Sequence, residues 1–237
     1  MRAERALAAL RDAPLNFEPR PLEAYTPDRG WHVDALSQRL PGEAPGDPGP
    51  GGPWQIARRL MEDYRMADPA IVRAIWEPGA PLHGRDILLE LRLCKIVHAR
   101  VGVRVTQVWD EERVVDGRPA RVFGFEYATL RGHAEAGRMD YELYKWGDDG
   151  AVEFRLHAHS RASEDAPGWL RLGFRLFGRR QQVRFHLRCC ERLARLTAEE
   201  LGLADEPPPP AVLLRAADAP DTAEVTERLL PRRARRG

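Results

Sequence analysis

MDYELYKWGDDGAVEFRLHAHSRA, residues 139–162, is the stretch that decides the fold of this chain. Two runs that alternate at period two flank Gly147-Asp148-Asp149-Gly150, a pattern typical of a β-hairpin. The second run carries Val152, Phe154, Leu156 and Ala158 on one face and Glu153, Arg155, His157, His159 and Arg161 on the other. A turn of two or of four residues gives the same parity, so Tyr141 and Leu143 join the apolar face.

A second hairpin is predicted upstream. Asp116-Gly117 separates two strand-like runs and is a strong signal for a two-residue turn. In that register Glu112 faces Arg121, a complementary pair across the strands, and Glu126 faces Gln107.

Glu126 is the unusual residue of this second hairpin, because an acid buried among apolar side chains would have a raised pKa. Simple alternation places on its face Val103, Val105, Trp109, Val122, Ala128 and Leu130. The opposite face, with Phe123, Phe125, Tyr127 and Thr129, is also largely apolar. The pattern therefore leaves open which face looks inward.

Two helices are predicted from apolar residues at three- and four-residue spacing. The first follows Pro53 and presents Trp54, Ala57, Leu60, Met61 and Tyr64. The second spans about residues 168–201 and presents Trp169, Leu172, Leu176, Val183, Leu187, Cys190 and Ala194. A strand near 31–36 precedes the first helix, and six strands lie between the two helices.

This order predicts an α+β fold. Consecutive strands joined by short turns favour an antiparallel sheet, and its apolar face needs a cover. The only predicted element long enough is the C-terminal helix. We therefore expect a curved antiparallel sheet of about seven strands wrapped around a long C-terminal helix, which is the helix-grip, START-like arrangement.

The composition narrows the class of protein. Lys and Arg number 37 against 36 Asp and Glu, so a specific nucleic-acid partner is not expected. The apolar runs are shorter than the roughly 18 residues that a membrane span needs, and the N-terminus lacks a signal-peptide core, so we expect a cytoplasmic protein. The three cysteines have no metal spacing, and nucleotide-binding motifs are missing, so neither a metal nor a cofactor is expected.

Three regions are predicted along the chain. Residues 1–13 form a helical extension, and 14–201 form the helix-grip domain. A Pro- and Gly-rich stretch at 41–53 interrupts that domain as a flexible loop. Residues 202–237, which begin with a proline run and end in arginines, are expected to be a mostly disordered tail.

Residues 123–137, FGFEYATLRGHAEAG, resemble the signature F-G-F-x-Y-x-T-L-x-G-H-x-E-x-G of a bacterial and plant family. That family is filed as domain of unknown function nineteen-ninety, and the resemblance covers about residues 14–197. It implies a helix-grip fold and leaves the biochemical role open. Two departures stand out: Arg138 replaces what is more often an acid, and Glu126 what is more often a small residue.

Two histidine patterns are candidate sites. His133 and Glu135 place an imidazole near a carboxylate, as general acid–base work requires, although both side chains can instead bond the backbone of a strand connection. His157 and His159 share a strand face near Asp140 and Glu142, a possible metal-ligand set. The flanking arginines favour a charge-paired outer face there, so no metal site is predicted.

The main functional prediction is non-catalytic binding of a small apolar or amphipathic ligand between the sheet and the C-terminal helix. The residues expected to line this pocket are Phe125, Tyr127, Thr129, Tyr141, Leu143, Phe154, Leu156 and Trp169. The first alternative is a cyclase- or hydrolase-like enzyme that uses His133 with Glu135, or Glu126. The second is a protein–protein adaptor.

Overall fold

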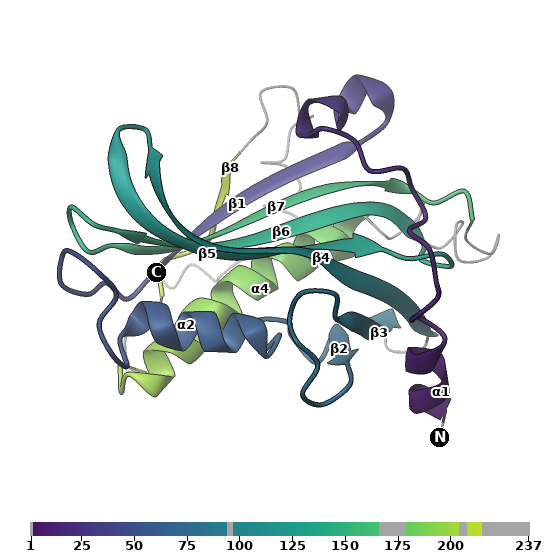
Figure 1. Ribbon diagram of the computed structural model, residues 1–237, viewed down its shortest axis with the longest axis horizontal. Helices are drawn as coiled ribbons and strands as arrows, with labels where there is room; N and C mark the ends of the chain where they lie inside the picture. Colours follow the sequence, from purple (N-terminus) through teal and green to yellow (C-terminus); the bar gives the residue numbers. More distant parts are fainter. Residues whose placement is uncertain (1, 94–96, 166–178, 204–207, 215–237) are drawn as a thin grey trace, which may run out of the picture.

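The computed structural model describes residues 2–93, 97–165, 179–203 and 208–214 (Figure 1). A single antiparallel sheet has the order β2-β3-β4-β5-β6-β7-β1-β8. Its strands are β1 (His32–Leu40), β2 (Val72–Ile75), β3 (Asp86–Leu93), β4 (Val97–Val115), β5 (Arg118–Thr129), β6 (Glu135–Trp146), β7 (Val152–Ala162) and β8 (Val212–Leu214). The α-helices are α1 (Arg2–Ala8), α2 (Pro53–Glu62) and α4 (Arg179–Glu200). Two 3₁₀ turns, η1 (Leu22–Ala24) and η2 (Pro27–Arg29), precede β1.

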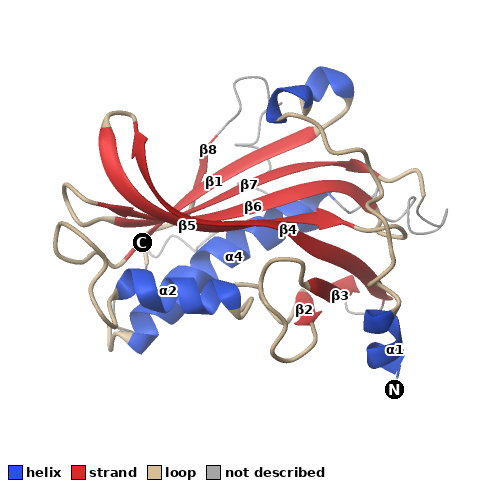
Figure 2. Cartoon of the chain, viewed as in Figure 1, coloured by secondary structure: helices blue, strands red, loops and turns tan. Residues whose placement is uncertain are grey.

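Both α2 and α4 lie against the same side of the curved sheet, as Figure 2 shows. We call this side the inner face and the opposite side the outer face. Inner-face residues of the strands and apolar residues of α2 and α4 form one continuous hydrophobic core. The predicted helix-grip architecture and the predicted order of strands and helices are therefore confirmed.

The two predicted hairpins form in the expected registers. Val115 pairs with Arg118, and both Asp116 and Gly117 have positive φ, so the turn has two residues. Glu112 pairs with Arg121, and Gln107 pairs with Glu126, as predicted. In the later hairpin Tyr141 pairs with Leu156 and Leu143 with Phe154, which places all four on the inner face.

A β-bulge in β4 corrects the predicted surroundings of Glu126. The register between β4 and β5 shifts between Val105 and Gln107, so Thr106 is an extra residue in its strand. Val103 and Val105 consequently belong to the inner-face core, while Trp109 packs on the outer face. Simple alternation placed all three on one side and was wrong because it assumed an uninterrupted strand.

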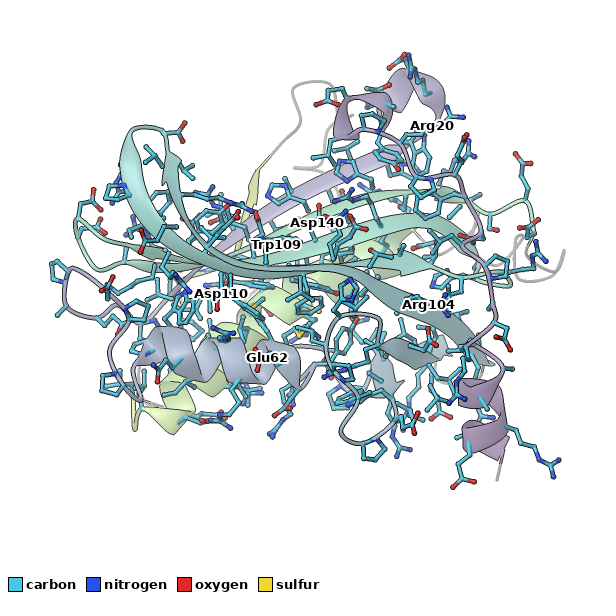
Figure 3. All side chains as sticks on the ribbon, in the orientation of Figure 1. Arg20, Glu62, Arg104, Trp109, Asp110 and Asp140 are labelled. Atoms are coloured by element: carbon cyan, nitrogen blue, oxygen red, sulfur yellow. The ribbon has the colours of Figure 1, made fainter. Side chains whose placement is uncertain are left out.

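The helix α2 forms as predicted, with Pro53 in its first turn. Its predicted apolar side chains are buried, and the partly buried Arg58 lies over the ring of Phe123 and donates to Asp110 of β4 at 2.6 Å. Figure 3 shows Asp110 on the side of the sheet that α2 covers. The ion pair and the apolar face together hold α2 against the sheet.

The predicted C-terminal helix is described from residue 179 onward. Its predicted apolar face is buried in the core through Val183, Leu187, Cys190 and Ala194. The helix packs on β1, on β7 and on α2. Trp169, Leu172 and Leu176 lie outside the described residues.

Two segments that were expected to be flexible or disordered make contacts with the sheet. Residues 41–52 have no regular structure, yet the ammonium of Lys145 donates to the carbonyls of Ala44 and Gly46 at 2.7 and 3.0 Å. Residues 212–214, within the predicted disordered tail, form β8 and pair with 35–37 of β1. The proline run obscured this strand, which has three residues in the described part of the tail.

Candidate functional site

Aromatic side chains fill the middle of the inner face. The ring of Tyr141 lies 5.1 Å from that of Phe125 and 6.1 Å from that of Phe154, measured between centroids. With Leu143 and Leu156 they are fully buried, so these five predicted lining residues pack on one another and on the helices. The five residues share one packed interior, and their role in lining a ligand pocket stays a prediction.

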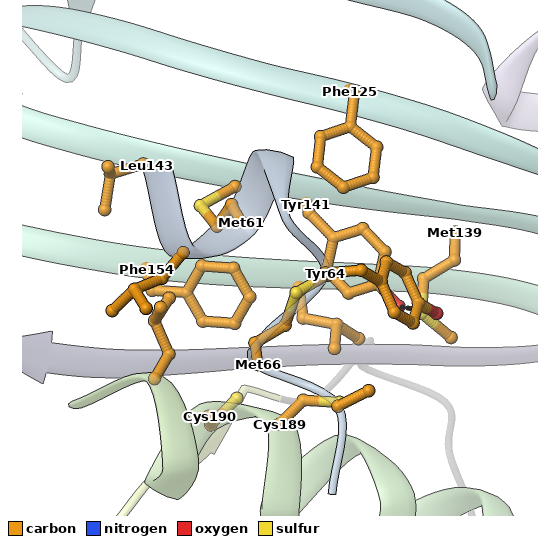
Figure 4. Packing of buried hydrophobic residues seen from close by; sticks show 14 of the residues in the cluster. Met61, Tyr64, Met66, Phe125, Met139, Tyr141, Leu143, Phe154, Cys189 and Cys190 are labelled. Atoms are coloured by element: carbon orange, nitrogen blue, oxygen red, sulfur yellow. Dashed lines mark hydrogen bonds between the residues drawn. The ribbon is translucent and has the colours of Figure 1, made fainter. Parts of the chain in front are cut away.

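Three tyrosine hydroxyls meet at one point of this interior. Figure 4 shows two of these residues, Tyr64 and Tyr141, close together. The hydroxyls of Tyr64 and Tyr141 are 3.3 Å apart, and that of Tyr141 donates to Tyr127 at 3.5 Å. Tyr127 in turn donates to the sulfur of Met139, a weak acceptor, at 3.6 Å. Burial raises the pKa of Tyr127 to about 12, so its hydroxyl is neutral and can donate at physiological pH.

Tyr64 joins this group because the chain turns sharply after α2. Its φ is +52°, in the left-handed region that side chains rarely adopt. The sequence pattern assigned Tyr64 only to the apolar face of a helix and did not predict a role for its hydroxyl. A backbone conformation of this kind has no signature in apolar spacing.

Thr129, another predicted lining residue, uses its hydroxyl to bond neighbouring parts of the chain and does not leave it free for a ligand. Its hydroxyl donates to Asn16 Oδ1 at 2.6 Å and accepts from the Gly137 N–H at 2.9 Å. Asn16 also donates to the carbonyl of Glu135 at 2.7 Å. These bonds fasten the ends of β5 and β6 to the N-terminal segment.

A polar cluster occupies the inner face where β1 and β7 meet the start of α4. Asp34 accepts two hydrogen bonds from the Arg179 guanidinium. Gln182 Nε2 donates to Ser160 Oγ at 2.6 Å, and Nδ1 of His186 lies 3.5 Å from the Asp34 carboxylate. Burial opposes the charge of Asp34, but His186 and Arg179 outweigh it and hold its pKa well below the ordinary value.

These polar residues were not among the predicted site residues, although the sequence carries a signal for them. Asp34 shares its strand face with Leu36 and Leu40, and His186 is three residues after Val183 on the stripe of α4. A polar residue at an otherwise apolar position of an amphipathic element marks a buried polar contact.

His133 and Glu135 do not form the predicted imidazole–carboxylate pair. His133 Nδ1 accepts a hydrogen bond from the backbone N–H of Glu135 at 3.0 Å, which is the alternative that the sequence also allowed. Burial lowers the pKa of His133 to about 4, so the imidazole is neutral at pH 7. Burial and the Asp34 charge raise the pKa of the Glu135 carboxyl to about 7.

Glu126 lies on the outer face, away from the core between sheet and helices. It forms an ion pair with Arg138 at 2.5 Å, accepts a hydrogen bond from Thr106, and is almost fully buried. Arg138 also donates to Asp140 at 2.8 Å. The two departures from the family signature, Glu126 and Arg138, thus neutralise each other, and Glu126 does not face the predicted pocket.

The outer face also carries His157 and His159. Arg155, between them and Glu153, donates to the Glu153 carboxylate at 2.9 Å, as expected for a charge-paired surface. Burial, followed by the neighbouring Arg138 charge, lowers the pKa of His159 to about 4. Within the described ranges, groups of three or more His, Cys, Asp or Glu side chains placed to hold a metal ion are not found.

A family model matches residues 19–192, most of the chain, including the sheet from β1 to β7, α2 and most of α4. The chain belongs to the family described as Domain of unknown function (DUF1990). The family match thus includes the Asp34 cluster, the tyrosines and the signature at 123–137. The curated proteins contain no match to this chain.

Solved structures similar to this family member share little sequence with it. The crystal structure of Ara h 8.0201 is 12% identical, with a TM-score of 0.39, over 73% of this chain and 99% of that one. A solution structure of a protein from Arthrobacter aurescens is 12% identical, with a TM-score of 0.40, over 76% and 90%. One from Thermobifida fusca is 14% identical, with a TM-score of 0.35, over 69% and 94%. In the described part of the chain, a helix long and apolar enough to cross a membrane is not found.

Proposed function

We propose that this chain binds one small amphipathic molecule between the inner face of the sheet and α4. The observation that carries this proposal is a change of character along the inner face. One end of the inner face is apolar and includes Leu143 and Phe154. The other end is polar and includes Asp34 and Ser160. The tyrosine hydroxyls lie between these two ends. An apolar wall with a few converging polar groups is typical of a small-molecule site.

The polar end is the better place for ligand entry. Phe125, Tyr141 and Phe154 have no accessible surface, whereas Tyr127 and Met139 retain 6% and 7%. A ligand would therefore meet Tyr127 and Met139 first and displace side chains there. Methionine suits this role because its unbranched side chain adapts to new neighbours.

The tyrosine hydroxyls would orient the bound molecule. Tyr127 donates to a thioether sulfur, and exchanging this weak acceptor for a ligand oxygen or nitrogen would strengthen the bond. The predicted polar contacts of the ligand therefore include Tyr127 and Tyr141, while Thr129 serves to hold the strand ends.

An enzyme on the same scaffold has less support. Its proposed acid–base pair would need His133 and Glu135 to face one substrate, but the His133 ring bonds the backbone. Its other candidate, Glu126, lies on the outer face in an ion pair. Ligand binding without catalysis requires neither residue to react.

The test is to detect and then block binding. Native mass spectrometry of the purified protein is expected to show one co-purified small molecule, and the neutral dye Nile red is expected to bind the emptied protein saturably. Met139→Trp should weaken dye binding by adding bulk at the proposed entrance. Val114→Trp is the control, because Val114 is 76% exposed on β4. Lack of both a bound molecule and saturable dye binding would refute the proposal.

A further inference from the structure

Glu135 is the acid at the polar end of the inner face whose charge is not compensated. It alternates with Met139 and Tyr141 on β6 and so lies on the inner side, and its side chain is partly accessible. Among the described residues, its carboxylate has neither an ion pair nor a hydrogen bond. Other acids close to this end, such as Asp34, are paired.

The charges near Glu135 do not supply a partner. Asp34 and Arg179 are close enough to act on the Glu135 carboxyl, but they bind each other through two hydrogen bonds and cancel to a first approximation. Ionisation of Glu135 therefore leaves one net negative charge at the polar end of the inner face. Burial, followed by the Asp34 charge, raises the pKa of Glu135 to about 7, and the Arg179 charge offsets this only in part.

A second buried polar residue, His186, lies beside Asp34 at this end of the inner face. His186 is fully buried between α4 and β1, and both of its ring nitrogens are without a hydrogen bond in the described structure. Its Nδ1 lies 3.5 Å from Asp34. A buried polar group without a hydrogen bond is costly, and such groups often mark places where a ligand or water binds.

We propose that the polar group of the ligand is a protonated amine that binds the Glu135 carboxylate beside the Asp34–Arg179 pair. This inference rests on the proposed function and names the chemical class of its ligand. An ammonium supplies the missing positive charge, and its N–H groups can also donate to a tyrosine oxygen. A carboxylate or sulfate in the same place would face the ionised Glu135 carboxylate and be repelled.

The experiment compares three probes with one chain length: decylamine, decanol and decanoate. Each probe is titrated against Nile red bound to the emptied wild-type protein at pH 8, where the amine is charged, and its affinity is measured from the displacement of the dye. Decylamine is expected to bind about tenfold or more tightly than decanol, the scale of one charge-assisted hydrogen bond, and decanoate more weakly than both. This comparison needs no variant, so it stands even if a substituted protein folds poorly.

Variants then assign the preference to its residue. In Glu135→Gln the ratio of decylamine to decanol affinity should fall to near one. Glu142→Gln is the matched control, because Glu142 is an acid of the same strand on the outer face, bound to Arg113 at 2.7 Å. The control should keep the wild-type ratio.

The outcomes separate the two proposals. If Nile red and all three probes fail to bind wild type, ligand binding itself is refuted. If decanol or decanoate binds as tightly as decylamine, or if Glu135→Gln keeps the amine preference, the amine inference is overturned while ligand binding stands.

Discussion

The carboxylate of Asp34 on β1 accepts two hydrogen bonds, each 2.5 Å long, from the guanidinium of Arg179 at the start of α4. This pair joins the sheet to the first described turn of the helix that covers it. It thereby fixes the position of α4 at the polar end of the proposed site.

The first prediction concerns this pair. Asp34→Asn should lower the free energy of unfolding by about 2 kcal/mol, because it removes a charge-assisted, mostly buried pair and leaves Arg179 without its counter-charge. Glu90→Gln, which breaks a more exposed pair with Arg100, should cost less than about 1 kcal/mol. Urea denaturation of both variants checks this, and equal costs would contradict it.

The packed middle of the inner face should respond as a solid core. Phe125→Ala is expected to cost about 3–5 kcal/mol, because the fully buried ring leaves a cavity that the sheet cannot close. Val114→Ala, at an exposed position of β4, should change stability by less than about 0.5 kcal/mol. A small cost for Phe125→Ala would mean that the ring borders open space.

The raised pKa of Glu135 predicts a pH dependence of stability. Between the ordinary pKa of 4.5 and the folded value of about 7, the folded protein keeps a proton that the unfolded chain releases. Its free energy of unfolding therefore falls as the pH rises through this window. Glu135→Gln lacks this term, so its stability relative to wild type should be greater at pH 8 than at pH 5.

Thermal melts of both proteins from pH 5 to pH 8 measure this difference. The neighbouring His133, whose lowered pKa acts in the opposite direction, is present in both proteins and largely cancels. A constant difference across the range would show that Glu135 ionises as it does in water.

Gly137 should tolerate no side chain. A Cβ atom there would lie 2.0 Å from the backbone carbonyl oxygen of His159 on the neighbouring strand, and that oxygen cannot swing away. Gly137→Ala is expected to cost about 3 kcal/mol, at the upper end for overpacking. Gly147→Ala, where the nearest atoms are at an ordinary 3.5 Å, is the control, and chemical denaturation compares the two.

Sequence reasoning predicted the hairpins and the inner-face aromatics because their signals are local. Asp116-Gly117 fixes a turn, and period-two alternation then fixes which side chains share a face. The bulge at Thr106 was not predictable, since both faces of this hairpin are largely apolar and alternation reads the same with or without an extra residue. The tyrosine cluster was missed in part because Tyr64 arrives through a left-handed backbone.

The polar half of the site depends on contacts between distant parts of the chain. Asp34 and Arg179 meet only when α4 crosses β1. The position of Asp34 among apolar residues of β1 shows that a polar group is buried there, but it does not identify the partner of that group. His133 and Glu135 are two residues apart, yet the His133 ring, in the connection before β6, bonds the backbone while Glu135 begins the strand. Closeness in sequence therefore did not show that the two side chains interact.

The short strand β8 has a consequence for the edge of the sheet. It pairs with residues 35–37 of β1, which would otherwise present free N–H and C=O groups at the end of an eight-stranded order. Such an edge is a template for a strand from another molecule. A protein cut before residue 212 would expose this edge, and self-association and aggregation through it would then compete with correct folding.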